Sequence, residues 1–352
     1  MERSQMRAIS AVDAISPAIQ RTKELLFRPF SWTTYLKLCL VAVLTESIGS
    51  NLRSSTRGGS SPEHSPDIAS SFHLAPQWFV AIAVGALVAI VVGCVLFYLI
   101  TRLRFAFLHC LIHNTKQIGP GWRLYADQAM RFFWLNLAVG FGFLLLVALI
   151  AIPFVAGFWR LFHDIPPGGH PDVIAMLSLA MPLIPIVLLL ALVGLLLDVI
   201  LRDLMLPHYA LDNATAGMAW ARVWAHIKAE KRQFIVYALL RVILPTIAAI
   251  ALFILLLIPG AILVGGLAMF GYGLHSAYAG ATGAAAITGI ALQAFFGLLG
   301  FGLAVLAGIC LGGPVSTTVR EYALVFYGGR YQPLGDILYP PPPASLNAPQ
   351  PA

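Results

Sequence analysis

The chain has 352 residues, of which 59% are hydrophobic and 11% are charged. A soluble domain carries about 25% charged residues, so this composition excludes an ordinary soluble fold and predicts a membrane protein. The formal net charge is +7. In so apolar a chain we interpret this charge as an orientation signal and an attraction to anionic lipid headgroups, with no nucleic-acid partner.

Six apolar stretches follow one another along the chain, and each is long enough to cross the hydrocarbon core of a bilayer as a helix. We expect spans at about 33–50, 78–103, 132–158, 173–200, 234–258 and 287–312. Lipid-exposed backbone must satisfy its own hydrogen bonds, which favours helices over open strands. The fold class is therefore predicted to be all-α, a transmembrane bundle of six spans.

Prolines fall inside or beside several of these spans. They are Pro153, Pro182, Pro185, Pro245 and Pro259. Because proline removes a backbone donor and its ring clashes with the preceding turn, we expect local kinks or helix ends at these positions.

The spans are predicted to form three tandem two-helix units. A phenylalanine marks the junction into each odd-numbered span, and Phe30, Phe132 and Phe234 are spaced 102 positions apart. A fixed period of self-similarity indicates repeated structural units. The expected units are about 15–113, 119–214 and 217–328.

Basic residues predict the orientation. Seventeen of the 22 Lys and Arg fall in the N-terminus, about 101–131, 201–233 and the C-terminal segment, whereas three fall in the opposite set of loops. Cytoplasmic segments carry the excess of Lys and Arg. Both termini are therefore expected in the cytoplasm.

An amphipathic stretch precedes each odd-numbered span. These stretches begin near Ile15, Trp122 and Trp220 and place apolar residues on one helical face and cations opposite. We predict interfacial helices on the cytoplasmic side of the membrane. The alternative is that they are the cytoplasmic ends of long transmembrane helices.

The remaining segments have loop-like compositions. The outer loop 49–77 is rich in Ser and Gly, and the segment from Pro340 opens with four consecutive prolines. We predict one membrane domain, 1–330, followed by a Pro-rich disordered tail, 331–352.

Charged residues inside spans are the candidate functional residues, because such charges are costly in lipid. Lys37 and Arg241 occupy the same position in the first and third units, and Asp198 lies at a similar depth. We expect these three to form one polar cluster, either as a structural pairing or as a site for an anionic lipid or substrate. Asp198 could instead pair with Arg202 at i, i+4.

Glu46 is a second candidate. It lies near the outer end of the first span. A buried carboxylate there could relay protons, although contact with water on the outer side is the interpretation that we favour.

No metal, cofactor or catalytic site is predicted. His109 and His113 share a helical face, but no third ligand is recognisable nearby. Small-residue stripes containing Gly300 and Gly85 indicate close helix packing, within the chain or between copies in a homo-oligomer.

Three segments resemble a family of uncharacterised prokaryotic six-helix membrane proteins. They are Ile15–Phe30, the run from Leu201–Pro207 to Trp220 and Phe234, and Val319–Gly328. That family is similar to the membrane domain attached to some glycerophosphodiester phosphodiesterases. The resemblance implies a bacterial or archaeal inner membrane, but the phosphodiesterase barrel has no counterpart here.

The leading functional prediction is a non-enzymatic role in organising the membrane or in handling lipid or another amphiphile. The alternative is a small-solute transporter that uses the intramembrane charges. An intramembrane enzyme comes third, because no catalytic set of residues is recognisable in the sequence.

Overall fold

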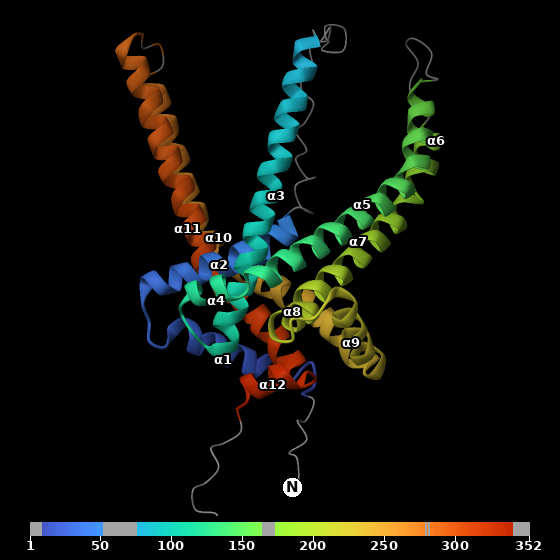
Figure 1. The fold of residues 1–352 in the computed structure, drawn as a ribbon. Helices are drawn as coiled ribbons and strands as arrows, with labels where there is room; N and C mark the ends of the chain where they lie inside the picture. Colours follow the sequence, from blue (N-terminus) through green and yellow to red (C-terminus); the bar gives the residue numbers. More distant parts are fainter. Residues whose placement is uncertain (1–8, 52–75, 164–172, 279, 281, 341–352) are drawn as a thin grey trace, which may run out of the picture. The chain divides into compact units, whose positions relative to one another are not determined.

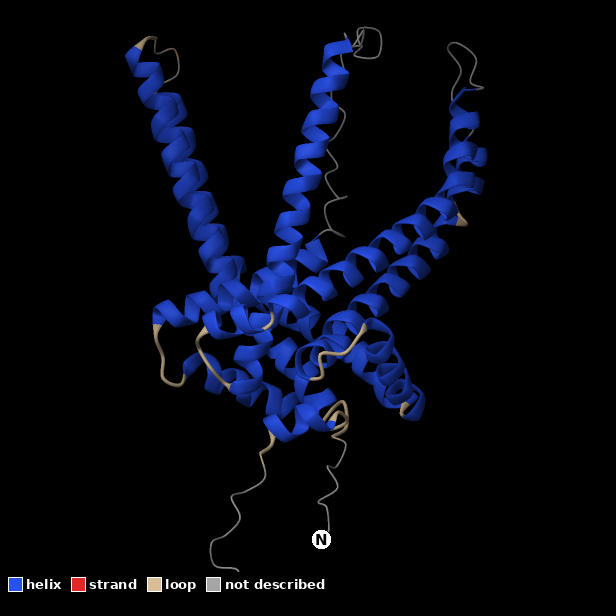
Figure 2. Ribbon diagram, viewed as in Figure 1, coloured by secondary structure: helices blue, strands red, loops and turns tan. Residues whose placement is uncertain are grey.

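The computed structural model describes residues 9–51, 76–163, 173–278, 280 and 282–340. Every regular element in these ranges is a helix (Figure 2). This confirms the predicted all-α class. The outer loop 52–75 and the segments 164–172 and 341–352 lie outside the described residues.

The α-helices of the described chain are labelled in Figure 1. The helical elements are α1 (Ile15–Phe27), α2 (Trp32–Asn51), α3 (Pro76–His113), α4 (Ile118–Leu124), α5 (Ala126–His163), α6 (Val173–Ala180), α7 (Leu183–Val199), the π-helical segment η2 (Ile200–Met205), α8 (Leu206–Leu211), α9 (Ala216–Ala229), α10 (Lys231–Ala277), α11 (Ala284–Gly328) and α12 (Gln332–Leu338).

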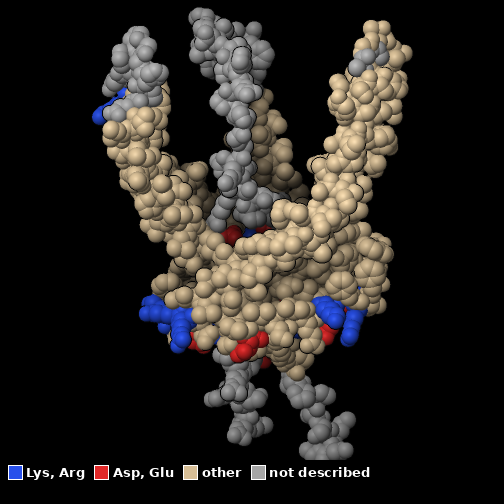
Figure 3. All heavy atoms as spheres, turned by 180° about the vertical axis from the view of Figure 1, so that it is seen from behind, with Lys and Arg blue, Asp and Glu red and all other residues tan. Residues whose placement is uncertain are grey.

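Five helical stretches in the described part of the chain are long and apolar enough to cross a membrane. They are Ile82–His113, Ala126–His163, Val173–Leu211, Lys231–Ala277 and Ala284–Gly328. Many of their large apolar side chains are exposed, which is unfavourable in water and favourable in lipid. Figure 3 shows these lengths almost entirely without charged atoms. The chain is therefore a multi-pass helical membrane protein.

The helices extend well beyond the predicted spans. At 47 residues, α10 is about twice the length that the hydrocarbon core requires. It continues through Pro245 and Pro259, and α5 continues through Pro153. The chain leaves the helix at Met181 and Pro182, between α6 and α7. Neighbouring groups in membrane helices can satisfy the backbone that an internal proline frees.

The chain divides into two compact units by its internal contacts. The first comprises Met1–Ser54, His109–Ile118 and Glu230–Ala352, and the second comprises Ser55–Leu108 and Gly119–Ala229. The first unit contains α1, α2, α10, α11 and α12. Each unit is described below by itself.

α11 is the central helix of the first unit, since α1, α2, α10 and α12 all pack against it. The ring of Tyr237 on α10 stacks on Tyr322 and Phe326 of α11, with centroids 5.4 and 4.4 Å apart. From Thr317 to Gly328, α11 is mostly buried, whereas Leu298 nearer its start is 71% exposed. One helix thus serves as a core element at its C-terminal end and as a lipid-facing element before it.

Arg21 of α1 joins the N-terminal helix to this core. Its Nε atom lies 3.0 Å from a carboxylate oxygen of the buried Glu321 on α11. The same guanidinium donates hydrogen bonds to the backbone carbonyls of Leu111 and Leu338. One side chain therefore connects α1, the end of α3, α11 and α12.

Arg330, which follows the end of α11, contacts both the N-terminal segment and the residue before α10. Its guanidinium lies 2.7 Å from a carboxylate oxygen of Glu230 and donates a hydrogen bond to the carbonyl of Ile9 at 3.0 Å. The guanidinium also lies over the Phe326 ring, 4.0 Å from its centroid. The two ends of the described chain thus meet at the C-terminal end of α11.

α12 corrects the prediction of a disordered tail over 331–352. Leu334 and Leu338 of α12 are buried, and a methyl carbon of Leu338 lies close to Gly328 of α11. The prediction ended the membrane domain at residue 330. The two leucines, one helical turn apart, were the signal that it missed.

The second unit is held by aromatic contacts between α3, α5 and α8. Phe132 of α5 is buried between Phe105 of α3 and Tyr209 of α8, with ring centroids 5.6 and 5.2 Å away. Arg131 donates a hydrogen bond to Asn213 at 2.7 Å. The predicted junction phenylalanine is therefore a core residue of this unit.

The amphipathic stretches before α2 and α10 form helices of their own, α1 and α9. On α9, Val223 is buried as the pattern predicted, but Trp220 and Trp224 are exposed and stack on each other at 6.1 Å. On α1, Ile19 lies outside the buried stripe. The location of these helices at the membrane surface stays a prediction.

Candidate functional site

A buried cluster of three charged residues lies where α2, α10 and α11 of the first unit meet. A guanidinium nitrogen of Arg241 on α10 donates to a carboxylate oxygen of Glu46 on α2 at 2.9 Å. Arg320 of α11 forms an ion pair with the other oxygen of the same carboxylate. The three side chains are 11%, 12% and 7% exposed, in the order Arg241, Glu46 and Arg320. We call this set the Arg–Glu–Arg cluster.

Close packing of α2 against α11 brings Glu46 to this place. A Cβ atom added at Gly313 of α11 would collide with Cys39 of α2, and one at Gly312 would contact Val43. The Tyr35 hydroxyl donates to the carbonyl of Cys310 at 2.7 Å. Glycine at these positions lets the two helices approach closely, and one helical face of α2 then presents Glu46 to Arg320.

The Arg–Glu–Arg cluster carries one net positive charge. Each guanidinium keeps its charge under all ordinary conditions, and both pair with the single Glu46 carboxylate. Removing charges from water costs several kcal/mol per ion unless attraction and hydrogen bonds compensate.

Tyr322 adds a hydrogen-bonding group next to the cluster. Its side chain is buried, and its hydroxyl has no hydrogen-bond partner among the described residues. Tyr322 also interacts electrostatically with Arg241. Buried polar groups are normally satisfied by protein, water or ligand, so this hydroxyl could serve an oxygen-bearing ligand.

Of the predicted cluster of Lys37, Asp198 and Arg241, Arg241 pairs with Glu46, which the sequence analysis treated as a separate candidate. Lys37 lies exposed on α2. Asp198 lies in the second unit and pairs with Arg202 at 3.1 Å, which is the i, i+4 alternative drawn from the sequence. The contact of Asp198 with Lys37 and Arg241 would join the two units and stays a prediction.

The favoured interpretation of Glu46, contact with water on the outer side, stays a prediction, but the structure gives the carboxylate two protein partners. Its side chain is mostly buried between two arginines. The sequence prediction treated α2 as a simple span and counted Arg320 only as an orientation charge. The pairing of Glu46 with Arg320 depends on how α2 packs against α11. The spacing of residues within a single helix carries no information about that packing.

The remaining candidates form no further cluster in the described residues. His109 and His113 have ring centroids 4.4 Å apart. Within the described ranges no group of three or more His, Cys, Asp or Glu is placed to hold a metal ion. The stripe residues Gly85 and Gly93 of α3 have nothing within 4 Å of an added Cβ atom, whereas Gly300 of α11 closely approaches Leu267.

Comparison with known proteins gives one match. The model of a family of unknown function (DUF7544) matches residues 9–337 of the chain. No curated protein and no solved structure matches. The resemblance to the membrane domain of glycerophosphodiester phosphodiesterases therefore stays a prediction.

Proposed function

We propose, for a chain that belongs to the family of unknown function DUF7544, a non-enzymatic role in the inner membrane of a bacterium or archaeon: binding of anionic lipids or other anionic amphiphiles. The observation that carries this proposal is the Arg–Glu–Arg cluster, a buried set with one net positive charge.

The position of the cluster along α11 suits a lipid headgroup. Arg320 lies where α11 is buried in the core of the first unit, and most of the large side chains before Leu306 are exposed and apolar. A phosphate near Arg320 and Arg241 would therefore have its acyl chains beside an apolar helix surface. Arginine suits phosphate recognition because its planar fork can donate two parallel hydrogen bonds.

Contacts within the first unit support an even number of membrane crossings. Arg21 contacts both Glu321 near the end of α11 and Leu111 at the end of α3. The start of the chain and these two helix ends therefore share one side. This shared side is consistent with an even number of crossings, as in the six-span prediction. The asymmetry of Lys and Arg favours the cytoplasm for this shared side.

The proposed tandem repeat is supported in its second and third copies. Phe132 packs edge-on against Tyr209 with centroids 5.2 Å apart, and Phe234 packs edge-on against Phe326 at 5.3 Å. In both copies the junction phenylalanine of the first helix meets an aromatic ring near the end of the second. Phe30 departs from this pattern, because it is 49% exposed.

The test is retention of phosphatidylglycerol by the full-length protein purified into nanodiscs of mixed phosphatidylcholine and phosphatidylglycerol. Arg241→Gln leaves Arg320 and Glu46 as a neutral pair and should lower the retained phosphatidylglycerol about fivefold, since one basic residue contributes about 1 kcal/mol near an anionic surface. Glu46→Gln raises the net charge of the cluster and should increase retention.

Arg160→Gln is the matched control, because it removes one exposed cation from α5 outside the cluster. It should leave retention unchanged. If Arg241→Gln and Glu46→Gln shift retention in the same direction, or alter only thermal stability, the cluster is a structural ion pair and the proposal fails.

A further inference from the structure

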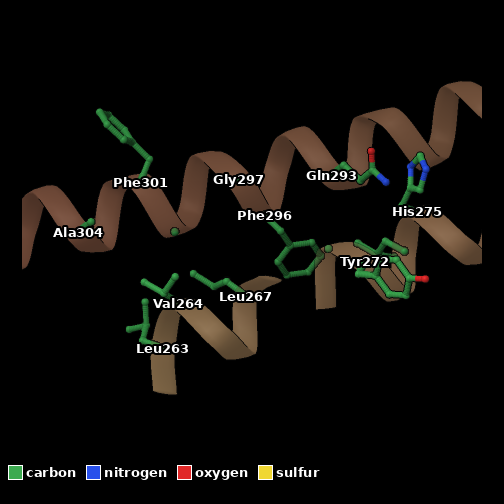
Figure 4. A pocket seen from close by; sticks show the side chains of 13 residues that line it. Leu263, Val264, Leu267, Tyr272, His275, Gln293, Phe296, Gly297, Phe301 and Ala304 are labelled. Atoms are coloured by element: carbon green, nitrogen blue, oxygen red, sulfur yellow. The ribbon is translucent and has the colours of Figure 1, made fainter. Parts of the chain in front are cut away.

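A groove runs along the contact between α10 and α11, far along both helices from the Arg–Glu–Arg cluster. Its volume is about 650 Å³. The lining residues come from both helices, and Figure 4 shows how they lie. They are Leu263, Val264, Leu267, Gly271, Tyr272, Leu274, His275, Gln293, Phe296, Gly297, Gly300, Phe301 and Ala304.

Two glycines open this groove. The approach of Leu267 to Gly300 and of Tyr278 to Gly289 fixes the antiparallel register of the two helices. In that register Gly271 and Gly297 lie at the same level. A Cβ atom added at either position would meet nothing within 4 Å, so the missing side chains leave space on both sides of the groove.

The groove is polar at one end and apolar along the rest. His275 and Gln293 lie together at the end nearest the loop between the helices, close to Tyr272 (Figure 4). Leu263 and Ala304 mark the apolar end. No Asp, Glu, Lys or Arg lines the groove. An occupant should therefore have a hydrogen-bonding group without a required charge at one end and a hydrocarbon body at the other.

The length of the groove matches one leaflet of a bilayer. From Leu263 to His275 the helix advances about 18 Å at 1.5 Å per residue, and half of the hydrocarbon core is about 15 Å. Both helices are membrane-spanning candidates, so lipid is the solvent that surrounds the groove.

We propose that this groove, the tip groove, binds one acyl chain of a zwitterionic phospholipid of the loop-side leaflet, with the lipid's ester and headgroup region hydrogen-bonded to His275, Gln293 and Tyr272. The proposal goes beyond anionic lipid binding at the Arg–Glu–Arg cluster and does not depend on it. It gives the α10–α11 hairpin a site that distinguishes one bound lipid from the lipids that merely surround the protein.

The test uses the full-length protein in nanodiscs that contain a phosphatidylcholine with a photoreactive diazirine in the middle of one acyl chain. After illumination, mass spectrometry of peptides locates the labelled residues. Label should concentrate on Leu267 and Phe296, compared with Ile290 and Leu298, which are 67% and 71% exposed and do not line the groove. Equal labelling of the two sets would show ordinary bilayer contact and overturn the proposal.

A second experiment fills the groove with a larger side chain. Gly297→Leu should reduce labelling of Leu267 and Phe296 about tenfold, which corresponds to about 1.4 kcal/mol of lost binding free energy. Gly302→Leu adds the same side chain to the same helix outside the groove, where an added Cβ atom also has open space, and should change nothing. If both variants reduce labelling equally, or neither does, the site is not there.

A variant on α10 tests the same site independently, in case Gly297→Leu disturbs the structure of α11. Gly271→Leu should reduce the same labelling, and Gly273→Leu is its control, because Gly273 has open space and does not line the groove. Retained phosphatidylglycerol in the same samples reports separately on the Arg–Glu–Arg cluster. Loss of groove labelling with unchanged phosphatidylglycerol separates the two proposals.

Discussion

At the scale of single residues, the buried charges of the first unit have partners that lie far away in the sequence. Arg21 and Glu321 are 300 positions apart, and their side chains are 22% and 1% exposed. The carboxylate is therefore almost completely removed from solvent, while the guanidinium keeps some contact with it. The consequences of removing either partner should differ.

We expect Arg21→Met to destabilise the protein by about 3 kcal/mol, because it leaves the Glu321 carboxylate buried without its cation. Glu321→Gln should cost less, since a neutral amide replaces the charge and Arg21 keeps its carbonyl acceptors. Thermal unfolding of the full chain in detergent measures the loss of stability in both variants. The double variant Arg21→Met with Glu321→Leu should recover part of the lost stability. If the double variant is no more stable than Arg21→Met alone, this account is contradicted.

The sequence pointed to charged residues inside spans but not to their partners. Arg241 and Glu46 were both recognised as unusual, because a charge in lipid needs a reason. Arg320 was not, because it lies beyond the end of the predicted sixth span. The ion pair of Asp198 with Arg202 could be anticipated, since i, i+4 spacing places both on one helical face. Pairs between helices depend on how the helices cross.

At the scale of elements, the contact between α2 and α11 depends on one glycine. Gly313→Leu should push α2 away from α11, because even a Cβ atom at this position collides with Cys39. In a variant with the other three cysteines replaced by Ser, maleimide should then modify Cys39 faster, since this thiol is buried in the wild type. Overpacking should also cost about 1–3 kcal/mol of stability.

Gly308→Leu is the control for this experiment. It lies on the same helix and has nothing within 4 Å of an added Cβ atom, so Cys39 should stay protected. Equal reactivity of Cys39 in the two variants would show that the close approach of α2 and α11 does not bury this residue.

The existence of the helices could be predicted, but their ends could not. Apolar runs predict a span, and a span ends where polar residues begin. α11 continues through that point because its C-terminal end is packed in the core of the first unit, as the stacking of Phe326 on Tyr237 shows. α10 continues beyond its predicted end along residues 259–277, which are mostly exposed. Tertiary burial therefore accounts for the extension of α11.

At the scale of the whole molecule, the number and direction of membrane crossings can be measured directly. Reporter fusions at positions 60, 115, 168, 215, 280 and 345 should alternate between outside and inside, starting outside, because of the distribution of Lys and Arg. Two adjacent fusions on the same side would contradict six crossings. A fusion at 115 on the outer side would reverse the proposed orientation.

The contacts of α1 also fix an order of events during synthesis. The partners of its buried face, in α11 and α12, are translated about 300 residues later. At roughly 5–20 residues per second this is a delay of about 15–60 seconds. During that time the apolar stripe of α1 lacks its partners in α11 and α12, so a chaperone or the membrane surface must shield it. A ribosome-stalled chain that ends before α11 should therefore expose α1 to protease, whereas the released full-length chain should protect it.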